Sequence, residues 1–362
     1  MRACLLLRAE GGRYRRLGTG ARVGHRECKG RAGVRLRRGL PGLVCAYVGL
    51  TFAGTWVCWG LSALLGQVVR GAALTASAGA GDALNALAGA LQVMGTLVPA
   101  VVAYALFPRV RALGLAAGGG RDGAAMGHAA IGDPDCDAGG DDDPHAGFWA
   151  LAFGARPHLG GWLFFVVLAA WRWVMFRAAL GFPETPGAAL VSFFATLPAL
   201  LLGGGFEEIG WRGVLQPALT RLIAGDSGGS GVCGMSRRVA GVAIAPLLTG
   251  VIWACWHLPL FVMAGTYQHG LAFLPFVGIA VALSYSLGAL RALTGGTLAC
   301  ILGHAWYNAM LVAPLAPLMV GAADEGLAGQ AALFGTLFAL EAIVGAAILV
   351  LHATRGTQVS AV

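Results

Sequence analysis

The sequence predicts an all-α protein, a polytopic transmembrane helical bundle with about eight transmembrane helices. The chain of 362 residues is 57% hydrophobic and 12% charged, and its mean hydropathy is +0.72. Soluble domains carry roughly a quarter of charged residues, so this composition indicates an integral membrane protein. The apolar residues also gather in segments of about 20 residues, the length that a helix needs to cross a bilayer. These segments are residues 43–65, 84–106, 161–181, 187–206, 241–264, 272–290, 295–316 and 331–352.

The distribution of basic residues supports this count and predicts a cytoplasmic N-terminus. Of the 25 basic residues, 12 lie in residues 1–38. With a cytoplasmic N-terminus, 22 of the 25 lie in predicted inside segments and one, Arg70, in a predicted outside loop. This asymmetry follows the positive-inside rule. A basic tail beside a membrane segment sets topology or contacts anionic lipid, so we expect the lipid bilayer as a partner and no nucleic acid.

The composition divides the chain into five parts. Residues 1–42 are predicted to be a disordered basic cytoplasmic tail, and residues 43–113 the first two transmembrane helices. Residues 114–147, rich in Gly, Ala and Asp, are predicted to be a disordered acidic cytoplasmic loop. Residues 148–352 form a helical core with the polar motifs, and residues 353–362 a cytoplasmic C-terminal tail. Arg outnumbers Lys 24 to 1, which together with abundant Ala and Gly suggests a GC-rich genome. We expect an integral membrane protein of a bacterial plasma membrane.

The stretch GGGFEEIGWRG, residues 203–213, begins where the fourth apolar segment ends and carries two adjacent carboxylates. Glu208 and Arg212 are four residues apart, so on a helix they share a face and can form an ion pair. Glu207 is rotated about 100° from that face, which leaves it as the acid for chemistry. Ionisable groups in membrane segments mark functional sites by default. The alternative is that the three residues form a solvated helix end at the cytoplasmic boundary.

Two further apolar segments carry histidines. His257 follows Trp253 by one turn in WACWHLP, and Pro259 is expected to end the helix just beyond it. His304 and Asn308 are four residues apart in HAWYN and therefore point into one space. Either motif alone could serve structure, as a buried hydrogen-bonded histidine or as a bridge between helices.

Together, these residues indicate hydrolytic chemistry. A carboxylate shielded from water can act as a general base near neutral pH, and His or Asn donors can hold a developing oxyanion. Alternatively, Glu207, His257 and His304 could bind zinc with a metal-bound water. The eight cysteines contain no CxxC pair, so they predict neither a thiolate zinc site nor a disulfide framework. Zinc therefore remains an open alternative, and no other cofactor is expected.

The three motifs, in this order on successive helices, resemble those of the CaaX protease and bacteriocin-processing (CPBP, or Abi) intramembrane proteases. The resemblance covers about residues 160–316. It implies a polytopic protein of about eight helices; eukaryotic members remove the last three residues of prenylated CaaX proteins, and others are implicated in bacteriocin processing or self-immunity. One departure is Trp253, where the family usually has Phe, an exchange expected to change the shape of the pocket and not the chemistry.

The resemblance also implies a role for each matching residue. Glu207 would activate water, His257 would help to position it, and His304 and Asn308 would stabilise the oxyanion. Glu208 and Arg212 would support the site. Outside the motifs, Glu341 is expected to pair with Arg172 or Arg177.

The sequence therefore predicts an intramembrane endopeptidase that hydrolyses a peptide bond of a membrane-associated or lipidated protein or peptide. Two alternatives stay open. One is a non-catalytic immunity or membrane-binding protein on the same scaffold. The other is an ion-coupled transporter, against which the lack of an internal repeat counts. Neither the substrate, prenylated or not, nor the oligomeric state follows from the sequence.

Overall fold

The computed structural model describes residues 21–72, 78–115, 143–155, 158–180, 186–225, 232–312 and 326–358. These residues contain helices and no strand, which confirms the predicted all-α class. The helices are α1 (Ala21–Ala72), α2 (Ala78–Ala105), α3 (Phe107–Ala112), α4 (Phe148–Phe153), α5 (Leu159–Leu180), α6 (Pro186–Leu200), η1 (Leu201–Gly205), α7 (Glu207–Gly210), η2 (Trp211–Leu215), α8 (Gln216–Ala224), α9 (Val232–Trp256), η3 (Leu258–Phe261), α10 (Phe273–Thr294), α11 (Leu298–Val312) and α13 (Gly326–Gln358).

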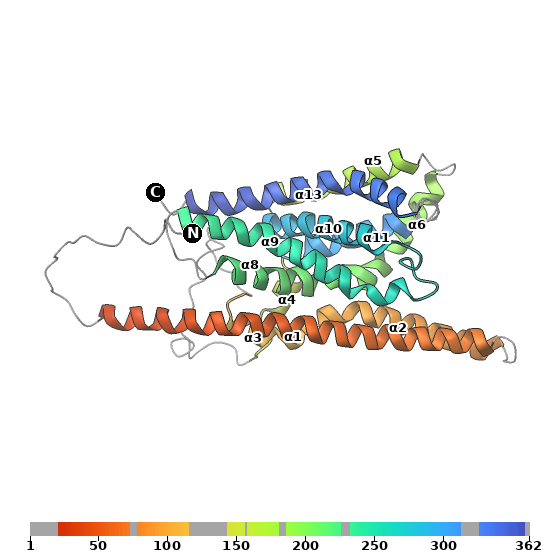
Figure 1. Cartoon of the computed structure of the whole chain (residues 1–362), viewed down its shortest axis with the longest axis horizontal. Coiled ribbons are helices and arrows are strands. Elements are labelled where there is room, and N and C mark those ends of the chain that lie inside the picture. The colour runs from red at the N-terminus through yellow and green to blue at the C-terminus, as the bar shows by residue number, and fades with distance from the viewer. Residues whose placement is uncertain are drawn as a thin grey trace.

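The long helices run along one common direction (Figure 1). The pair α1 and α2 packs together along the lower side of the bundle in that view, and α5 and α13 lie along its upper side. Between these two layers, α10 packs against α9, α11 and α13. The consecutive pieces α6, η1, α7, η2 and α8 pass through the middle of the bundle from right to left.

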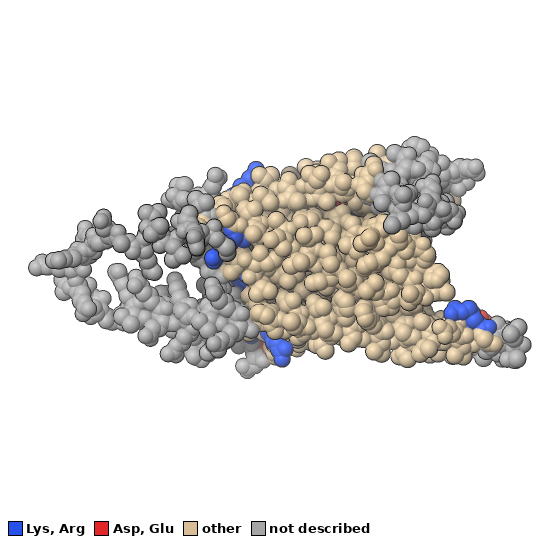
Figure 2. Space-filling view, viewed as in Figure 1, with Lys and Arg blue, Asp and Glu red and all other residues tan. Residues whose placement is uncertain are grey.

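In the described part of the chain, six stretches are long and apolar enough to cross a membrane, and they identify an integral membrane protein. These are Gly39–Gly71, Gly81–Ala105, Leu190–Ala224, Cys233–Trp256, Phe273–Thr294 and Phe338–Arg355. On the visible face, Lys and Arg gather at the left end with one patch at the right end, and an uncharged surface lies between them (Figure 2). An uncharged band between two charged ends is the surface that a bilayer requires.

Six stretches, and not eight, therefore qualify as spans among the described residues. The predicted segments 161–181 and 295–316 are also helical, as α5 and α11, but their described apolar stretches are shorter. The apolar part of α5 is Leu159–Val174, and α11 has 15 residues.

Two predicted boundaries are wrong. The segment expected to end at residue 206 continues as a kinked helix to Ala224, so Glu207 and Glu208 lie inside the bundle and not at its end. The segment expected to end at residue 264 stops at Trp256, because Pro259 turns the chain into the short η3 helix. His257 consequently lies just after a helix and not inside one.

The ends of the chain differ in part from the prediction. Helix α1 begins at Ala21, so the tail expected to be disordered over residues 1–42 is helical from Ala21 onward. Arg and Ala are good helix formers, which favours extension of the first apolar helix into this region. Helix α13 likewise continues to Gln358, within the predicted tail 353–362. Most of the acidic loop predicted over residues 114–147 lies outside the described residues.

Candidate active site

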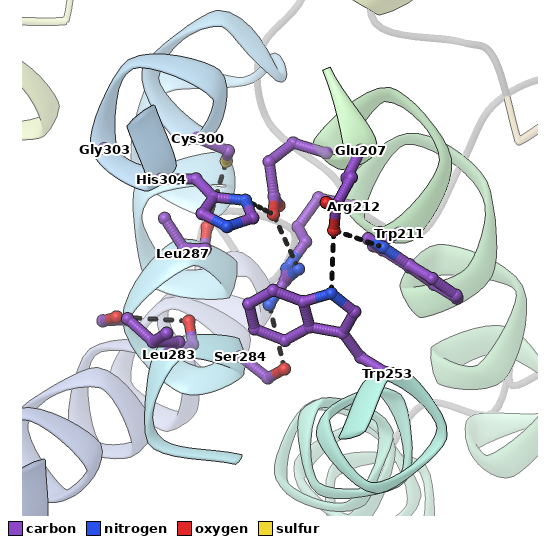
Figure 3. A network of polar contacts seen from close by, with 12 residues as sticks. Glu207, Trp211, Arg212, Trp253, Leu283, Ser284, Leu287, Cys300, Gly303 and His304 are labelled. Carbon is purple, nitrogen blue, oxygen red and sulfur yellow. Dashed lines mark hydrogen bonds and ion pairs between the residues drawn. The ribbon is translucent and has the colours of Figure 1, made fainter. Parts of the chain in front are cut away.

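The polar residues of the three motifs meet in the middle of the bundle. The kinked helix α6–α8 supplies Glu207, Glu208 and Arg212, α11 supplies His304, and α9 supplies Trp253 (Figure 3). The two glutamates, Arg212 and His304 are each at most 3% exposed. The alternative of a solvated helix end is therefore wrong.

A kink at Gly203 and Gly204 begins the helix that carries the glutamates. Both glycines have non-helical backbone angles, and the amide of Phe206 donates to the carbonyl of Leu201 across five residues at 2.9 Å. Such wide turns are frequent at functional sites. The kink places Glu207 at the start of the new helix α7.

Glu208 contacts two basic side chains, Arg212 and His304. Its Oε1 accepts from Nη1 of Arg212 at 2.9 Å, which confirms the pairing predicted from their spacing. The same oxygen lies 2.9 Å from Nδ1 of His304, which therefore carries the proton of this contact. Nη2 of Arg212 donates to the hydroxyl of Ser284 on α10 at 2.9 Å. Glu208 thus connects α7, η2, α10 and α11 through one ionic network.

Glu207 has neutral partners instead. Its Oε2 accepts from the indole Nε1 of Trp253 at 2.9 Å and from that of Trp211 at 3.4 Å. Among the described residues, no basic side chain forms an ion pair with Glu207. Hydrogen bonds from neutral donors therefore orient the carboxylate of Glu207, while the guanidinium of Arg212 is bound to the neighbouring Glu208.

His257 lies in an aromatic enclosure next to Trp253. Its Nδ1 is 2.9 Å from the carbonyl oxygen of Trp253, which fixes the proton on Nδ1 and leaves Nε2 as the acceptor of the neutral ring. The rings of Trp59, Trp256 and Phe276 have centroids within 6.2 Å of the imidazole. Burial among aromatic rings disfavours the cationic form of a histidine.

Asn308 and His304 converge on Gly204. A Cβ atom on Gly204 would clash with the amide nitrogen of Asn308 and would lie 3.5 Å from Nε2 of His304. The missing side chain therefore lets both groups approach the kink, three residues before Glu207. The ring of His304 also meets the indole of Trp253 edge to face, with centroids 5.1 Å apart.

The donor set does not fit a metal centre as it stands. In the described part of the chain, no three His, Cys, Asp or Glu side chains are grouped so that they could hold one metal ion. Nδ1 of His304 is bonded to Glu208 and Oε2 of Glu207 to two indoles. The set Glu207, His257 and His304, predicted as an alternative zinc site, is therefore not assembled, and no chemical step is derived through a metal.

Two groups that contact the carboxylates and the arginine, Trp211 and Ser284, were not predicted from the sequence. Trp211 is four residues after Glu207, a helical spacing that could have indicated the contact. Ser284 lies on α10 and belongs to no motif, so no local signal points to it. The exchange at Trp253 was expected to affect only the pocket shape, but its indole N–H donates directly to Glu207, and Phe has no such donor.

Comparison with known proteins gives a family match for the segment that contains the site. Residues 189–310 match the family model described as Rce1-like, Type II CAAX prenyl endopeptidase Rce1-like. No curated protein and no solved structure matches the chain. The matched segment contains Glu207, Glu208, Arg212, His257, His304 and Asn308. The part of the chain that forms the buried site is therefore similar in sequence to the Rce1-like family of type II CAAX prenyl endopeptidases.

Proposed function

We propose that this protein is an intramembrane endopeptidase that hydrolyses a peptide bond of a membrane-associated or lipidated protein or peptide. The single observation that carries this proposal is the unequal environment of the two adjacent glutamates. Glu208 is bound to Arg212 and His304, whereas Glu207 receives only neutral donors. A buried carboxylate without a bound cation is suited to take a proton from water.

Glu207 is the proposed general base. The two indole donors hold Oε2, and among the described residues no group donates to Oε1. In the proposed mechanism, Oε1 accepts a proton from the attacking water, whose oxygen adds to the carbonyl carbon of the scissile bond. The proton is then delivered to the leaving amine as the peptide bond breaks.

His257 is proposed to position the same water. With its proton on Nδ1, its Nε2 can accept a hydrogen bond from that water. This role requires a neutral ring, which the surrounding aromatic side chains favour.

His304 and Asn308 are proposed to bind the oxyanion. As an imidazolium, His304 would donate from both ring nitrogens, from Nδ1 to Glu208 and from Nε2 to the oxyanion. Nε2 of His304 and the amide of Asn308 both approach Gly204, so two donors can converge on one oxygen. Donors of this kind act most strongly where water is excluded.

The test is a cleavage assay with purified protein in liposomes. The reporters are one fluorogenic peptide that ends in a prenylated CAAX sequence, the same peptide without the lipid, and a transmembrane peptide. These three separate prenylated, soluble and membrane-spanning substrates.

We expect Glu207→Gln to lower the cleavage rate by a factor of about 1,000 or more, because loss of a base and its water alignment removes the main source of catalysis. The unfolding midpoint should stay near that of the parent, since the amide preserves the shape of the side chain. Cleavage by Glu207→Gln at the parental rate would contradict the mechanism. Parental function of that variant in cells would favour a non-catalytic binding protein.

A further inference from the structure

A buried ion pair outside the matched segment lies behind the helix that carries His304 and Asn308. Arg172 on α5 and Glu341 on α13 are 2% and 4% exposed. Nε of Arg172 donates to Oε2 of Glu341 at 3.1 Å, and Nη2 donates to Oε1. The hydroxyl of Ser286 on α10 donates to the same carboxylate. This confirms the partner expected for Glu341 and identifies it as Arg172.

The third contact of Arg172 reaches the site helix itself. Nη1 donates to the carbonyl oxygen of Gly303 at 3.0 Å, and the guanidinium carbon lies 5.4 Å from the centre of the Tyr307 ring. Gly303 and Tyr307 are one turn apart on α11, and each directly precedes a site residue, His304 or Asn308. Arg172 therefore contacts α11 at two successive turns, on the face beside the site.

An ion pair used only for stability would be an unusual choice here. Burying two charges is expensive, and a well-packed apolar pair of similar volume often stabilises a protein as well or better. An apolar residue in place of Arg172, however, could not donate to Gly303. The planar guanidinium presents several donors in a rigid fork, so it can bind Glu341 and the Gly303 carbonyl at the same time.

We propose that Arg172 is a positioning residue for the reaction. Arg172 lies on α5, is bound to Glu341 on α13 and donates to the Gly303 carbonyl on α11. These bonds fix the position of α11 along its axis and its rotation about that axis. This places Nδ1 of His304 on Glu208 and the amide of Asn308 against Gly204. The catalytic consequence rests on the proposed function, whereas the effect on His304 does not.

The experiment compares Arg172→Gln with Glu341→Gln. Both variants break the same ion pair, but only Arg172→Gln removes the guanidinium that donates to Gly303 and replaces it with a shorter side chain. Glu341→Gln keeps an amide oxygen that can accept from Arg172. For each variant we would measure the unfolding midpoint in detergent, the downfield proton resonance of the His304 Nδ1–H in histidine-labelled protein, and kcat and KM for a cleaved reporter. The His304→Gln variant assigns the resonance.

We expect both variants to lower the unfolding midpoint. Only Arg172→Gln should shift or abolish the His304 resonance and lower kcat by about tenfold or more, with KM changed less than about twofold, because a displacement near 1 Å can cost about 100-fold in rate. Equal effects of both variants on the resonance, or an unchanged resonance in both, would overturn the proposal.

Two additions to the experiment allow it to decide for or against the role of Arg172 in every case. If Arg172→Gln does not fold, Arg172→Lys replaces it, because an ammonium keeps the charge but lacks the fork. A parental His304 resonance and kcat in that variant would overturn the proposal. If Glu207→Gln cleaves like the parent, the proposed function fails, and the resonance, which needs no substrate, still tests the role of Arg172.

Discussion

Glu207 and Glu208 are neighbours in the chain, but their carboxylates have different donors. Glu208 binds a guanidinium and an imidazole, and Glu207 binds two indoles. Because the helix rotates by about 100° per residue, adjacent side chains face different neighbours. One buried acid can therefore serve the structure while the next serves the chemistry.

The two indole N–H groups that donate to Glu207 should contribute unequally to the cleavage rate. Trp253→Phe removes the donor at 2.9 Å, and Trp211→Phe removes the one at 3.4 Å, while both keep an aromatic ring. A hydrogen bond to a charged group contributes about 1.5–3 kcal/mol, so Trp253→Phe should lower the cleavage rate by about 10- to 100-fold. Trp211→Phe should lower it by less. Initial rates at matched protein concentration test this order, and the reverse order would contradict the assignment of donors.

Arg212 should contribute more to the stability of the protein than an arginine on the surface does. It is fully buried, with bonds to Glu208 and Ser284 and its guanidinium 5.0 Å from the Trp253 ring. Arg212→Met would leave the Glu208 charge without its closest cation, a change that costs about 3–5 kcal/mol in buried pairs. Thermal unfolding in detergent should show a clearly lower unfolding midpoint for Arg212→Met than for the parent.

The double variant Glu208→Gln with Arg212→Met provides the control. It removes both charges together, so its unfolding midpoint should recover part of the loss. A double variant less stable than Arg212→Met alone would show that the uncompensated charge is not the cause.

Among the contacts between individual side chains, spacing along a helix predicted only a part. The i, i+4 pair of Glu208 and Arg212 follows from one helical turn, and it is present. The contact of His304 with Glu208 joins residues 96 positions apart, so no local pattern contains it. Arg172 was one of two arginines expected for Glu341, and only packing of α5 against its neighbours selects between them.

Among the elements, the kinked helix α6–α8 positions the site. Its break at Gly203 and Gly204 lets a single membrane-crossing stretch, Leu190–Ala224, change direction just before the glutamates. A continuous helix would carry Glu207 and Glu208 on the same axis as the apolar residues of α6. The break instead starts a new helix whose first residues face α11 and α9.

Gly204 and Gly203 offer a matched test of this element. A methyl group on Gly204 would clash with the amide of Asn308, whereas one on Gly203 would have no atom within 4 Å. Gly204→Ala should therefore displace Asn308 and lower the cleavage rate by about tenfold or more. Catalytic groups must stay within about 0.5 Å of their productive positions, and a larger displacement slows the reaction. Gly203→Ala should cleave close to the parental rate.

Both variants need unfolding midpoints measured beside their rates. Similar midpoints with different rates would locate the effect in the Asn308 contact. Equal loss of rate in the two variants would instead indicate that the kink itself, and not the approach of Asn308, is what alanine disturbs.

The sequence predicted which segments form helices, but it did not predict where those helices end. Each of the eight apolar segments contains a helix within its described residues, because long hydrophobic runs leave few other conformations in a membrane. The fourth segment was expected to end at residue 206, just before the charged residues. Glu208 and Arg212 instead form an ion pair inside the bundle, and the helix continues to Ala224. A rule based on apolar length cannot anticipate a buried ion pair.

For the whole molecule, several helix ends that carry basic residues share one end of the bundle, whereas Arg70 in the last turn of α1 lies at the other end. Arg221 near the end of α8 donates to the Leu113 carbonyl beyond α3, which brings these two ends together. Arg237 and Arg238 lie in the second turn of α9, and Arg355 is near the end of α13. The blue patches at the left of Figure 2 correspond to this end. By the positive-inside rule, we expect it to face the cytoplasm.

Labelling of single cysteines with a membrane-impermeant maleimide tests this orientation. In a cysteine-free variant, Cys233 would be restored at the start of α9, or His269→Cys introduced between η3 and α10; both positions are exposed. Since α9 separates them by a full candidate span, they should lie on opposite sides of the membrane. Intact cells should label only His269→Cys, and inside-out vesicles only Cys233. The opposite pattern would place the basic end outside, and labelling of both positions in intact cells would mean that α9 does not cross.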